Sequence, residues 1–214
     1  MKKGLFLLTI AILIGFNIIA QNKPSVSLNR SQTAFNWSTS IPLGDFSEFI
    51  SSASVAGGNF SYHYIFNTNL ALGFDAGING YSQKKSRQTF VDTANGFAIT
   101  ASHYNYVKSI PVKFVISYYL SPEKIICPYF RIGVGTNYMI EHVIIQDFDT
   151  YKDNWGFLFS PEAGVNARFG RFSRFGMNLA FSYWMNTNKF SFGYKEYSNL
   201  QGININLGIS YLLF

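Results

Sequence analysis

Residues 109–140 contain two stretches of strict two-residue alternation, and this feature limits the possible folds more than any other. Apolar side chains occupy every second position in 110–120 and, with Thr136 as the exception, again in 130–140, on either side of a short turn at 121–124. A period of two is that of a β-strand. The intervening positions include glycines, small polar residues and the full charges of Lys113 and Arg131, together with Pro111, Val115, Tyr119 and Met139. A soluble sandwich buries its apolar face, whereas a membrane barrel turns that face to lipid and the polar face to its lumen.

The first twenty residues are typical of a secretory signal peptide. Lys2 and Lys3 precede an apolar run that ends at Phe16, and Ala20 provides a small residue at the expected cleavage point. The run is shorter than the roughly twenty apolar residues that a transmembrane helix needs. The sequence therefore predicts a cleaved signal peptide over residues 1–20 and a single domain over 21–214.

Composition excludes several classes of protein. Charged residues make up 13% of the chain and aromatic residues 18%, against a typical charged share of about 25%. The basic residues are dispersed, with no run longer than Lys84-Lys85, so the clustered charge of a nucleic-acid-binding protein is absent from the sequence. Cys127 is the single cysteine, so the chain forms no intramolecular disulfide.

Alternation recurs in eight segments of the predicted mature chain. Their approximate bounds are 30–41, 55–66, 69–81, 109–120, 130–140, 156–169, 175–185 and 203–213. Three of the joins are short, at 67–69, 121–124 and 170–174, and four are long, at 42–54, 83–102, 146–154 and 186–200. An even number of antiparallel strands with this asymmetry is typical of bacterial outer-membrane barrels. We predict an all-β fold, an eight-stranded antiparallel up-and-down transmembrane β-barrel with short periplasmic turns and long extracellular loops.

Three short motifs resemble a known family. The segments 41–46 (IPLGDF), 109–114 (SIPVKF) and 129–135 (YFRIGVG) resemble those of porin-family proteins with an outer-membrane β-barrel domain, which are similar in architecture to the small eight-stranded barrels of Gram-negative outer membranes. The resemblance implies location in the outer membrane and recognition of the C-terminal aromatic residue, Phe214, by the barrel-assembly machinery. Phe214 is out of phase with the apolar set that ends at Leu213. The resemblance implies no single activity.

Charged residues that point into the barrel must be paired, because eight strands leave an interior that side chains just fill. Counting from the short turns places four charged positions at similar heights on consecutive strands and a fifth position lower down. The predicted luminal charge network consists of Asp75, Lys113, Arg131, Glu162 and, lower, Arg168. Such a network either fills and stiffens the barrel or lines a narrow ion path.

Candidate catalytic residues are few. Ser61 is expected opposite Asp75 on neighbouring strands, with His63 diagonal to it, and a lipid-modifying enzyme would need these groups within hydrogen-bonding reach. The three histidines and one cysteine show no metal-ligand spacing, and we expect no metal or cofactor. The sequence also lacks a nucleophile elbow and a phosphate-binding glycine loop.

Aromatic residues near strand ends fit the interfacial girdles of such barrels. They are Trp37, Tyr62, Tyr118, Tyr138, Tyr183 and Tyr211. The long loops carry charged and aromatic residues, and recognition commonly occurs on such loops. We expect a structural, adhesive or loop-mediated binding role, with outer-membrane lipid and an extracellular ligand as partners and no nucleic acid. A small or gated channel and a lipid-modifying enzyme are the alternatives. A soluble barrel with an apolar lumen is disfavoured by the polar inward positions.

Overall fold

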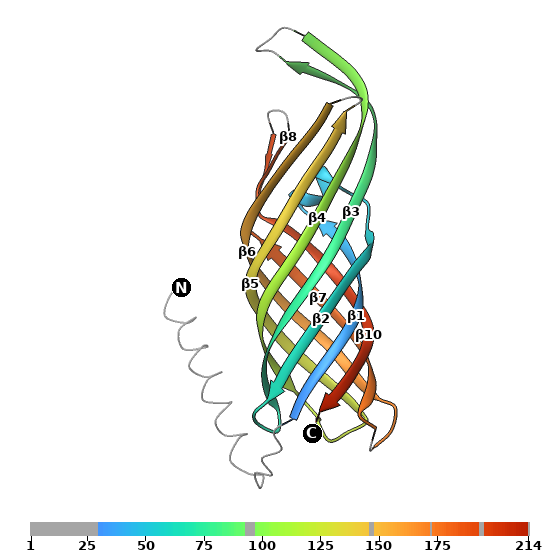
Figure 1. Cartoon of the computed structure of the whole chain (residues 1–214), viewed down its shortest axis with the longest axis vertical. Coiled ribbons are helices and arrows are strands. Elements are labelled where there is room, and N and C mark those ends of the chain that lie inside the picture. Colours follow the sequence, from blue (N-terminus) through green and yellow to red (C-terminus); the bar gives the residue numbers. More distant parts are fainter. Residues whose placement is uncertain (1–29, 93–96, 146–147, 172, 193–194, 214) are drawn as a thin grey trace, which may run out of the picture.

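Eight long strands form a closed antiparallel barrel in the computed structural model, which describes residues 30–92, 97–145, 148–171, 173–192 and 195–213 (Figure 1). The predicted signal peptide and Phe214 lie outside the described residues. The strands are β1 (Arg30–Leu43), β2 (Ser54–Ile65), β3 (Leu70–Asp92), β4 (Phe97–Tyr119), β5 (Ile126–Ile145), β6 (Phe148–Arg168), β7 (Phe175–Asn186) and β10 (Leu200–Leu213). Their order is β1-β10-β7-β6-β5-β4-β3-β2, so each barrel strand pairs with its neighbour in the chain and β1 closes on β10. The predicted up-and-down barrel is confirmed.

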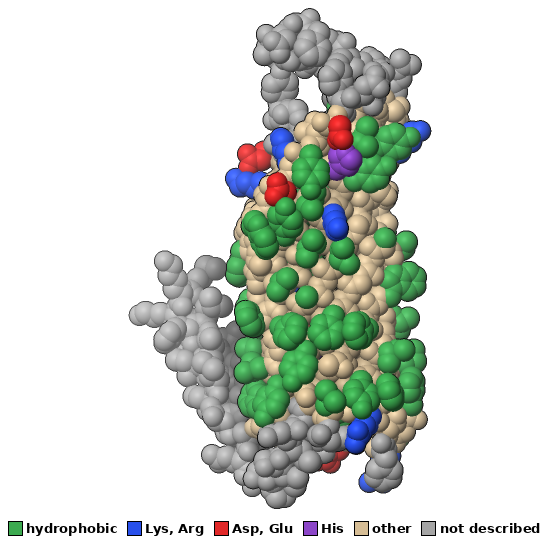
Figure 2. All heavy atoms as spheres, in the orientation of Figure 1, with side chains coloured by type: hydrophobic (Ala, Val, Ile, Leu, Met, Phe, Trp, Pro, Cys, Tyr) green, Lys and Arg blue, Asp and Glu red, His purple; other side chains and the backbone are tan. Residues whose placement is uncertain are grey.

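The alternation in the sequence separates an apolar outside from a polar inside. On β4 the outward Phe114 is 77% exposed, whereas the inward Ser117 is fully buried. Hydrophobic side chains cover much of the visible barrel wall as a broad belt (Figure 2). Of the predicted girdle residues, Trp37 is 60% exposed and the five tyrosines are partly exposed. A wall of this kind is stable only against lipid, because large apolar patches are rare on soluble proteins.

Four strands are longer than predicted. The intervals 83–102 and 146–154 were expected to be loops, but most of their residues continue β3 to β6 as paired strands. The pairing of β2 with β3 ends at Gly80, and that of β7 with β6 ends at Leu158. Beyond these points β3, β4, β5 and β6 form a four-stranded sheet that rises above the barrel, which we call the extracellular sheet (Figure 1).

The other two long loops contain short elements. In the first loop, Gly44 has a φ of 56°, a conformation that glycine adopts without strain, and the helix α2 (Asp45–Phe49) follows. In the last loop, β8 (Phe190–Phe192) pairs with β9 (Lys195–Tyr197) as a hairpin. Among the described residues, no helix is long and apolar enough to cross a membrane.

Candidate functional site

The barrel interior contains two ion pairs between neighbouring strands. Lys113 Nζ lies 3.7 Å from Asp75 Oδ2, between β4 and β3, and Arg131 Nη1 lies 3.1 Å from Glu162 Oε1, between β5 and β6. Both pairs are directly opposite in strand register. All four side chains are buried. Four of the five residues of the predicted network therefore form charge-compensated pairs in the lumen, as buried charges require.

Arg168 lies apart from these pairs. Its Nη2 atom donates hydrogen bonds to the carbonyl oxygens of Glu123 and Lys124, at 2.7 and 2.8 Å. Both carbonyls belong to the β4–β5 turn, so Arg168 braces this turn at the periplasmic end. The sequence placed Arg168 lower in the same network; the structure gives it main-chain acceptors instead, because β6 ends beside that turn.

His63 joins the ion pair of Asp75. Its Nε2 atom lies 3.0 Å from Asp75 Oδ1, and Ser61 stands directly opposite Asp75 in the β2–β3 register, as predicted. A Cβ atom at Gly73 would overlap the imidazole ring, so this glycine makes room for it. His63 and Ser61 are each 1% exposed and face the lumen. Ser61 Oγ has no hydrogen-bond partner among the described residues, so Ser61 is not linked to the contact between His63 and Asp75.

Two inward tyrosines connect the ion pairs to the rest of the interior. The guanidinium carbon of Arg131 lies 4.0 Å from the ring centroid of Tyr129, a cation–π contact. The Tyr129 hydroxyl lies 3.2 Å from Glu162 Oε1 and 2.8 Å from Asn178 Oδ1 on β7. Arg131 Nη2 also donates to the Tyr119 hydroxyl at 3.5 Å, and that hydroxyl donates to Gln32 Oε1 at 2.8 Å. These contacts extend the network across the lumen to β7 and β1.

Sequence reasoning missed the role of Tyr129. The sequence does contain an indication of this role, which is the glycine at position 164. Gly164 stands directly opposite Tyr129 in the β5–β6 register. A Cβ atom at Gly164 would lie 2.5 Å from atoms of the Tyr129 ring and hydroxyl. An inward aromatic residue facing a glycine on the next strand marks a ring that lies across the neighbouring strand.

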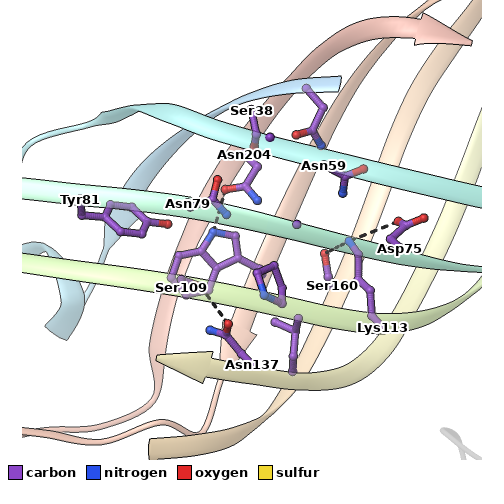
Figure 3. A pocket seen from close by; sticks show the side chains of 16 residues that line it. Ser38, Asn59, Asp75, Asn79, Tyr81, Ser109, Lys113, Asn137, Ser160 and Asn204 are labelled. Carbon is purple, nitrogen blue, oxygen red and sulfur yellow. Dashed lines mark hydrogen bonds and ion pairs between the residues drawn. The ribbon is translucent and has the colours of Figure 1, made fainter. Parts of the chain in front are cut away.

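A small cavity lies above the ion pairs. Its volume is about 30 Å³, and its wall includes Asp75, Lys113, Asn79, Asn137 and Ser109 (Figure 3). A cavity needs roughly 10–15 Å³ to hold one water, so this space accommodates two or three water molecules. Tyr81, Leu158 and Trp184 also line it, so its wall combines polar and apolar side chains.

An apolar cluster fills the extracellular mouth. The α2 residue Phe46 and the following Ile50 are fully buried, and Phe49 is 1% exposed. The Phe46 ring centroid lies 4.9 Å from that of Tyr81 and 5.7 Å from that of Trp184. We call the group formed by α2, Ile50 and the wall residues that they contact the mouth plug. Its buried hydrophobic members are Phe46, Phe49, Ile50, Tyr81, Val107, Met139, Val143, Leu158, Trp184, Phe190, Tyr197 and Leu200.

Polar side chains of the wall hold the plug in place. Asn105 Nδ2 donates to the carbonyl of Phe49 at 3.0 Å. Gln83 Oε1 accepts from the backbone N–H of Ser51 at 2.8 Å, and Lys85 Nζ donates to the carbonyl of Glu48 at 2.5 Å. The end of α2 and the residues that follow it are thereby fixed to β3 and β4.

One acidic side chain lies inside the wall at the level of the plug. Glu141 is 3% exposed, and its Oε2 atom has no hydrogen-bond partner among the described residues. It belongs to β5 beyond Tyr138, outside the lipid belt. Burial raises the pKa of the Glu141 carboxyl to about 7, against a smaller opposing effect of Lys152 on β6. Lys152 stands opposite Glu141 in register.

Comparison with solved structures identifies the fold. The attachment invasion locus protein Ail of Yersinia pestis aligns over 86% of this chain and 99% of its own, with a TM-score of 0.52 at 12% identity. This chain has the fold of a small outer-membrane β-barrel. The outer-membrane protease OmpT of Escherichia coli also aligns, over 91% of this chain and all of its own, with a TM-score of 0.50 at 7% identity.

The comparisons reach no further than the fold and its location. The solved structures that align are outer-membrane barrels, and the lipid-facing belt of this chain agrees with them; the protein is an outer-membrane barrel. No family model and no curated protein sequence matches the chain. Since barrels that align with this chain include an attachment protein and a protease, the fold itself specifies no role.

Proposed function

We propose that this protein is a non-conducting outer-membrane barrel that binds an external partner through its extracellular end. The observation that carries the proposal is the closure of the lumen at successive levels below a long, well-paired extracellular sheet. From the extracellular end towards the periplasmic end, these levels are the mouth plug, a cavity for two or three waters, and the buried ion pairs. A solute would have to displace all three to cross the barrel.

The extracellular sheet supports a recognition role. The β3–β4 pairing continues to Asp92 and Phe97, and the β5–β6 pairing to Ile145 and Phe148. Next to this sheet, the β8–β9 hairpin is braced by the exposed ion pair between Lys189 Nζ and Glu196 Oε1, at 2.7 Å. These extensions are not needed to cross the membrane. An ordered surface loses less conformational entropy than a flexible loop does when a partner binds, so the extensions suit a binding role.

The interior does not favour the enzymatic alternative. A lipid-modifying centre at His63 would need access for a lipid headgroup, and both His63 and Ser61 lie deep in the lumen. Lys113 compensates the charge of Asp75, and His63 Nε2 lies within hydrogen-bonding distance of the same carboxylate. We therefore assign these groups to stability.

Two measurements on the same preparation test the proposal. The full chain is reconstituted in planar bilayers, where we expect no single-channel steps, and in labelled vesicles applied to an array of polysaccharides and matrix proteins. A variant in which residues 87–101 are replaced by Asn-Gly keeps the last regular β3–β4 pair, Lys85 with His103. We expect vesicles with the full chain to be retained and those with the shortened hairpin to be lost. Regular conductance steps would support the channel alternative instead.

A further inference from the structure

The outward surface of the extracellular sheet carries a cluster of ring-bearing side chains from three strands. We call it the aromatic face; its members are Tyr104, Tyr106, Tyr138, His142, Tyr151 and Trp155. Tyr106 stands opposite His142, and His142 opposite Tyr151, so these three side chains form one row across β4, β5 and β6. Figure 2 shows hydrophobic, charged and histidine side chains gathered above the lipid belt. Tyr151 and Trp155 are 63% and 66% exposed.

The rings of this face are held in fixed positions by one another. The Tyr104 and Tyr106 rings are 12° from parallel, with centroids 6.4 Å apart. The His142 ring lies 5.9 Å from Tyr106 and 6.3 Å from Tyr151, and His142 Nε2 lies 2.5 Å from Asp149 Oδ1, which fixes the orientation of the imidazole. The face therefore offers ring surfaces with hydrogen-bonding groups at their edges.

Polar groups at two heights flank the rings. Lys84 Nζ lies 5.3 Å from the ring centroid of Tyr104, at the upper edge. At the lower edge, Tyr138 donates a hydrogen bond from its hydroxyl to Asp153 Oδ2 at 2.6 Å, and the Tyr138 and Trp155 ring centroids are 4.8 Å apart. The face thus combines flat apolar surfaces with charged groups of both signs.

The wall changes character in a fixed order along the outward positions of β4. Phe114 and Val112 belong to the exposed apolar belt, Lys108 is the first exposed charge beyond it, and Tyr106 and Tyr104 follow. Lys108 stands opposite Ile140, and Ile140 opposite Asp153. At about 3.3 Å per residue, Tyr106 lies roughly 26 Å along the strand from Phe114. The order from the membrane outwards is apolar, charged, aromatic.

We propose that the aromatic face docks the sugar portion of a phosphorylated glycolipid in the outer leaflet, with Lys108 at the level of its phosphate. Such a lipid has the same order of acyl chain, phosphate and sugar. The C–H faces of a sugar ring are attracted to the negative faces of aromatic rings, and a lysine ammonium donates hydrogen bonds to phosphate oxygens. Because the face points sideways from the sheet, its nearest neighbours are lipids of the same leaflet. The inference goes beyond the external partner proposed above and does not depend on it.

The experiment measures how much labelled glycolipid stays with the barrel. The full chain is reconstituted in phospholipid vesicles that contain labelled rough lipopolysaccharide, solubilised in mild detergent and captured, and the bound label is counted per barrel. The same capture is repeated with labelled lipid A, which lacks the core sugars, and with free labelled core oligosaccharide. The variants are Tyr106→Ser with Tyr151→Ser, and a control Tyr64→Ser at the opposite end of the wall.

We expect the full chain and the Tyr64→Ser control to retain rough lipopolysaccharide, and the double variant to lose that retention. Lipid A should be retained less than the sugar-bearing lipid, and the free oligosaccharide should not be retained. Equal retention by the double variant would overturn the proposal, and so would equal retention of lipid A, because the rings would then contribute nothing. Retention of the free oligosaccharide at the level of the intact lipid would overturn the assignment to a membrane glycolipid.

Discussion

Arg131 and Glu162 face each other across β5 and β6, with Nη1 3.1 Å from Oε1, and the Tyr129 ring lies beneath the guanidinium. The pair is buried on all sides. Tyr129 contacts both partners, since its ring meets Arg131 and its hydroxyl lies near Glu162 Oε1. A buried charge left without its partner is costly. The pair therefore makes the barrel sensitive to loss of either member.

Glu162→Ala should lower the thermal stability of the barrel strongly. Removing one partner of a buried ion pair typically costs about 3–5 kcal/mol, and here Arg131 would remain in the lumen. Glu196→Ala is the matched control, because Glu196 pairs with Lys189 at the surface, where such pairs contribute less than about 1 kcal/mol. The temperature at which the folded form disappears on a detergent gel measures both. Equal shifts would mean that the luminal pair has no special role.

Phe46→Ala should loosen the mouth plug without opening a pore. Truncating a fully buried phenylalanine typically costs about 3–5 kcal/mol, and Phe46 contacts Tyr81 and Trp184. We expect faster amide hydrogen exchange in residues 45–50. We expect no single-channel steps in planar bilayers, because the ion pairs below the plug still close the lumen. Phe35→Ala, on the lipid-facing wall, should leave that exchange unchanged. Conductance in the Phe46 variant would show that the plug alone closes the lumen.

Arg168→Ala should release the β4–β5 turn at the periplasmic end. Hydrogen bonds from a charged group contribute roughly 1.5–3 kcal/mol, and Arg168 gives two to this turn. We expect trypsin to cut after Lys124 faster in lipid nanodiscs, where both ends of the barrel are accessible. Arg171→Ala, an exposed change in the β6–β7 turn, serves as the comparison. Unchanged cleavage in both variants would show that the turn is held by its own main-chain bonds.

The transmembrane part of the fold was predictable because lipid outside and a packed lumen inside impose two-residue alternation on every strand. That rule placed Ser61 opposite Asp75, assigned Lys113 and Arg131 to the interior, and located the three short turns correctly. The rule weakens beyond the membrane, where polar and aromatic residues serve either face. The predicted loop 83–102 therefore turned out to be mostly strand.

The mouth plug and the long-range contacts were not predictable from the pattern. The helix α2 has five residues, too few to show helical periodicity. The bond from Asn178 Nδ2 to Asn36 Oδ1, at 2.9 Å, joins residues far apart in the chain, and counting along strands gives heights but not the reach of side chains across the lumen. The same limit applies to Arg168. Its position on the strand was predictable from the sequence, but its hydrogen-bond acceptors, the carbonyl oxygens of Glu123 and Lys124, were not.

Glu141 should make the mouth plug sensitive to pH. Its carboxyl has a pKa of about 7 in the folded barrel, raised by burial from an ordinary value of 4.5. The state with the plug in the mouth therefore binds the proton more tightly than a state in which the plug has left the mouth and Glu141 has its ordinary pKa. The stability of the plug consequently falls as pH rises from about 4.5 to about 7. Above that range both states are ionised and the stability is constant.

Hydrogen exchange of residues 45–50, measured from pH 5 to 8 and corrected for the intrinsic pH dependence of exchange, tests this prediction. The protection factor of the wild type should decrease from pH 5 to about 7 and then level off, whereas that of Glu141→Gln should stay constant, because the amide does not ionise. Asp153→Asn, a change at an exposed acid on the outward side of β6, should retain the wild-type profile. A pH-dependent loss of protection in Glu141→Gln would assign the titration to another group at the mouth, of which the inward-facing His103 on β4 is the first candidate.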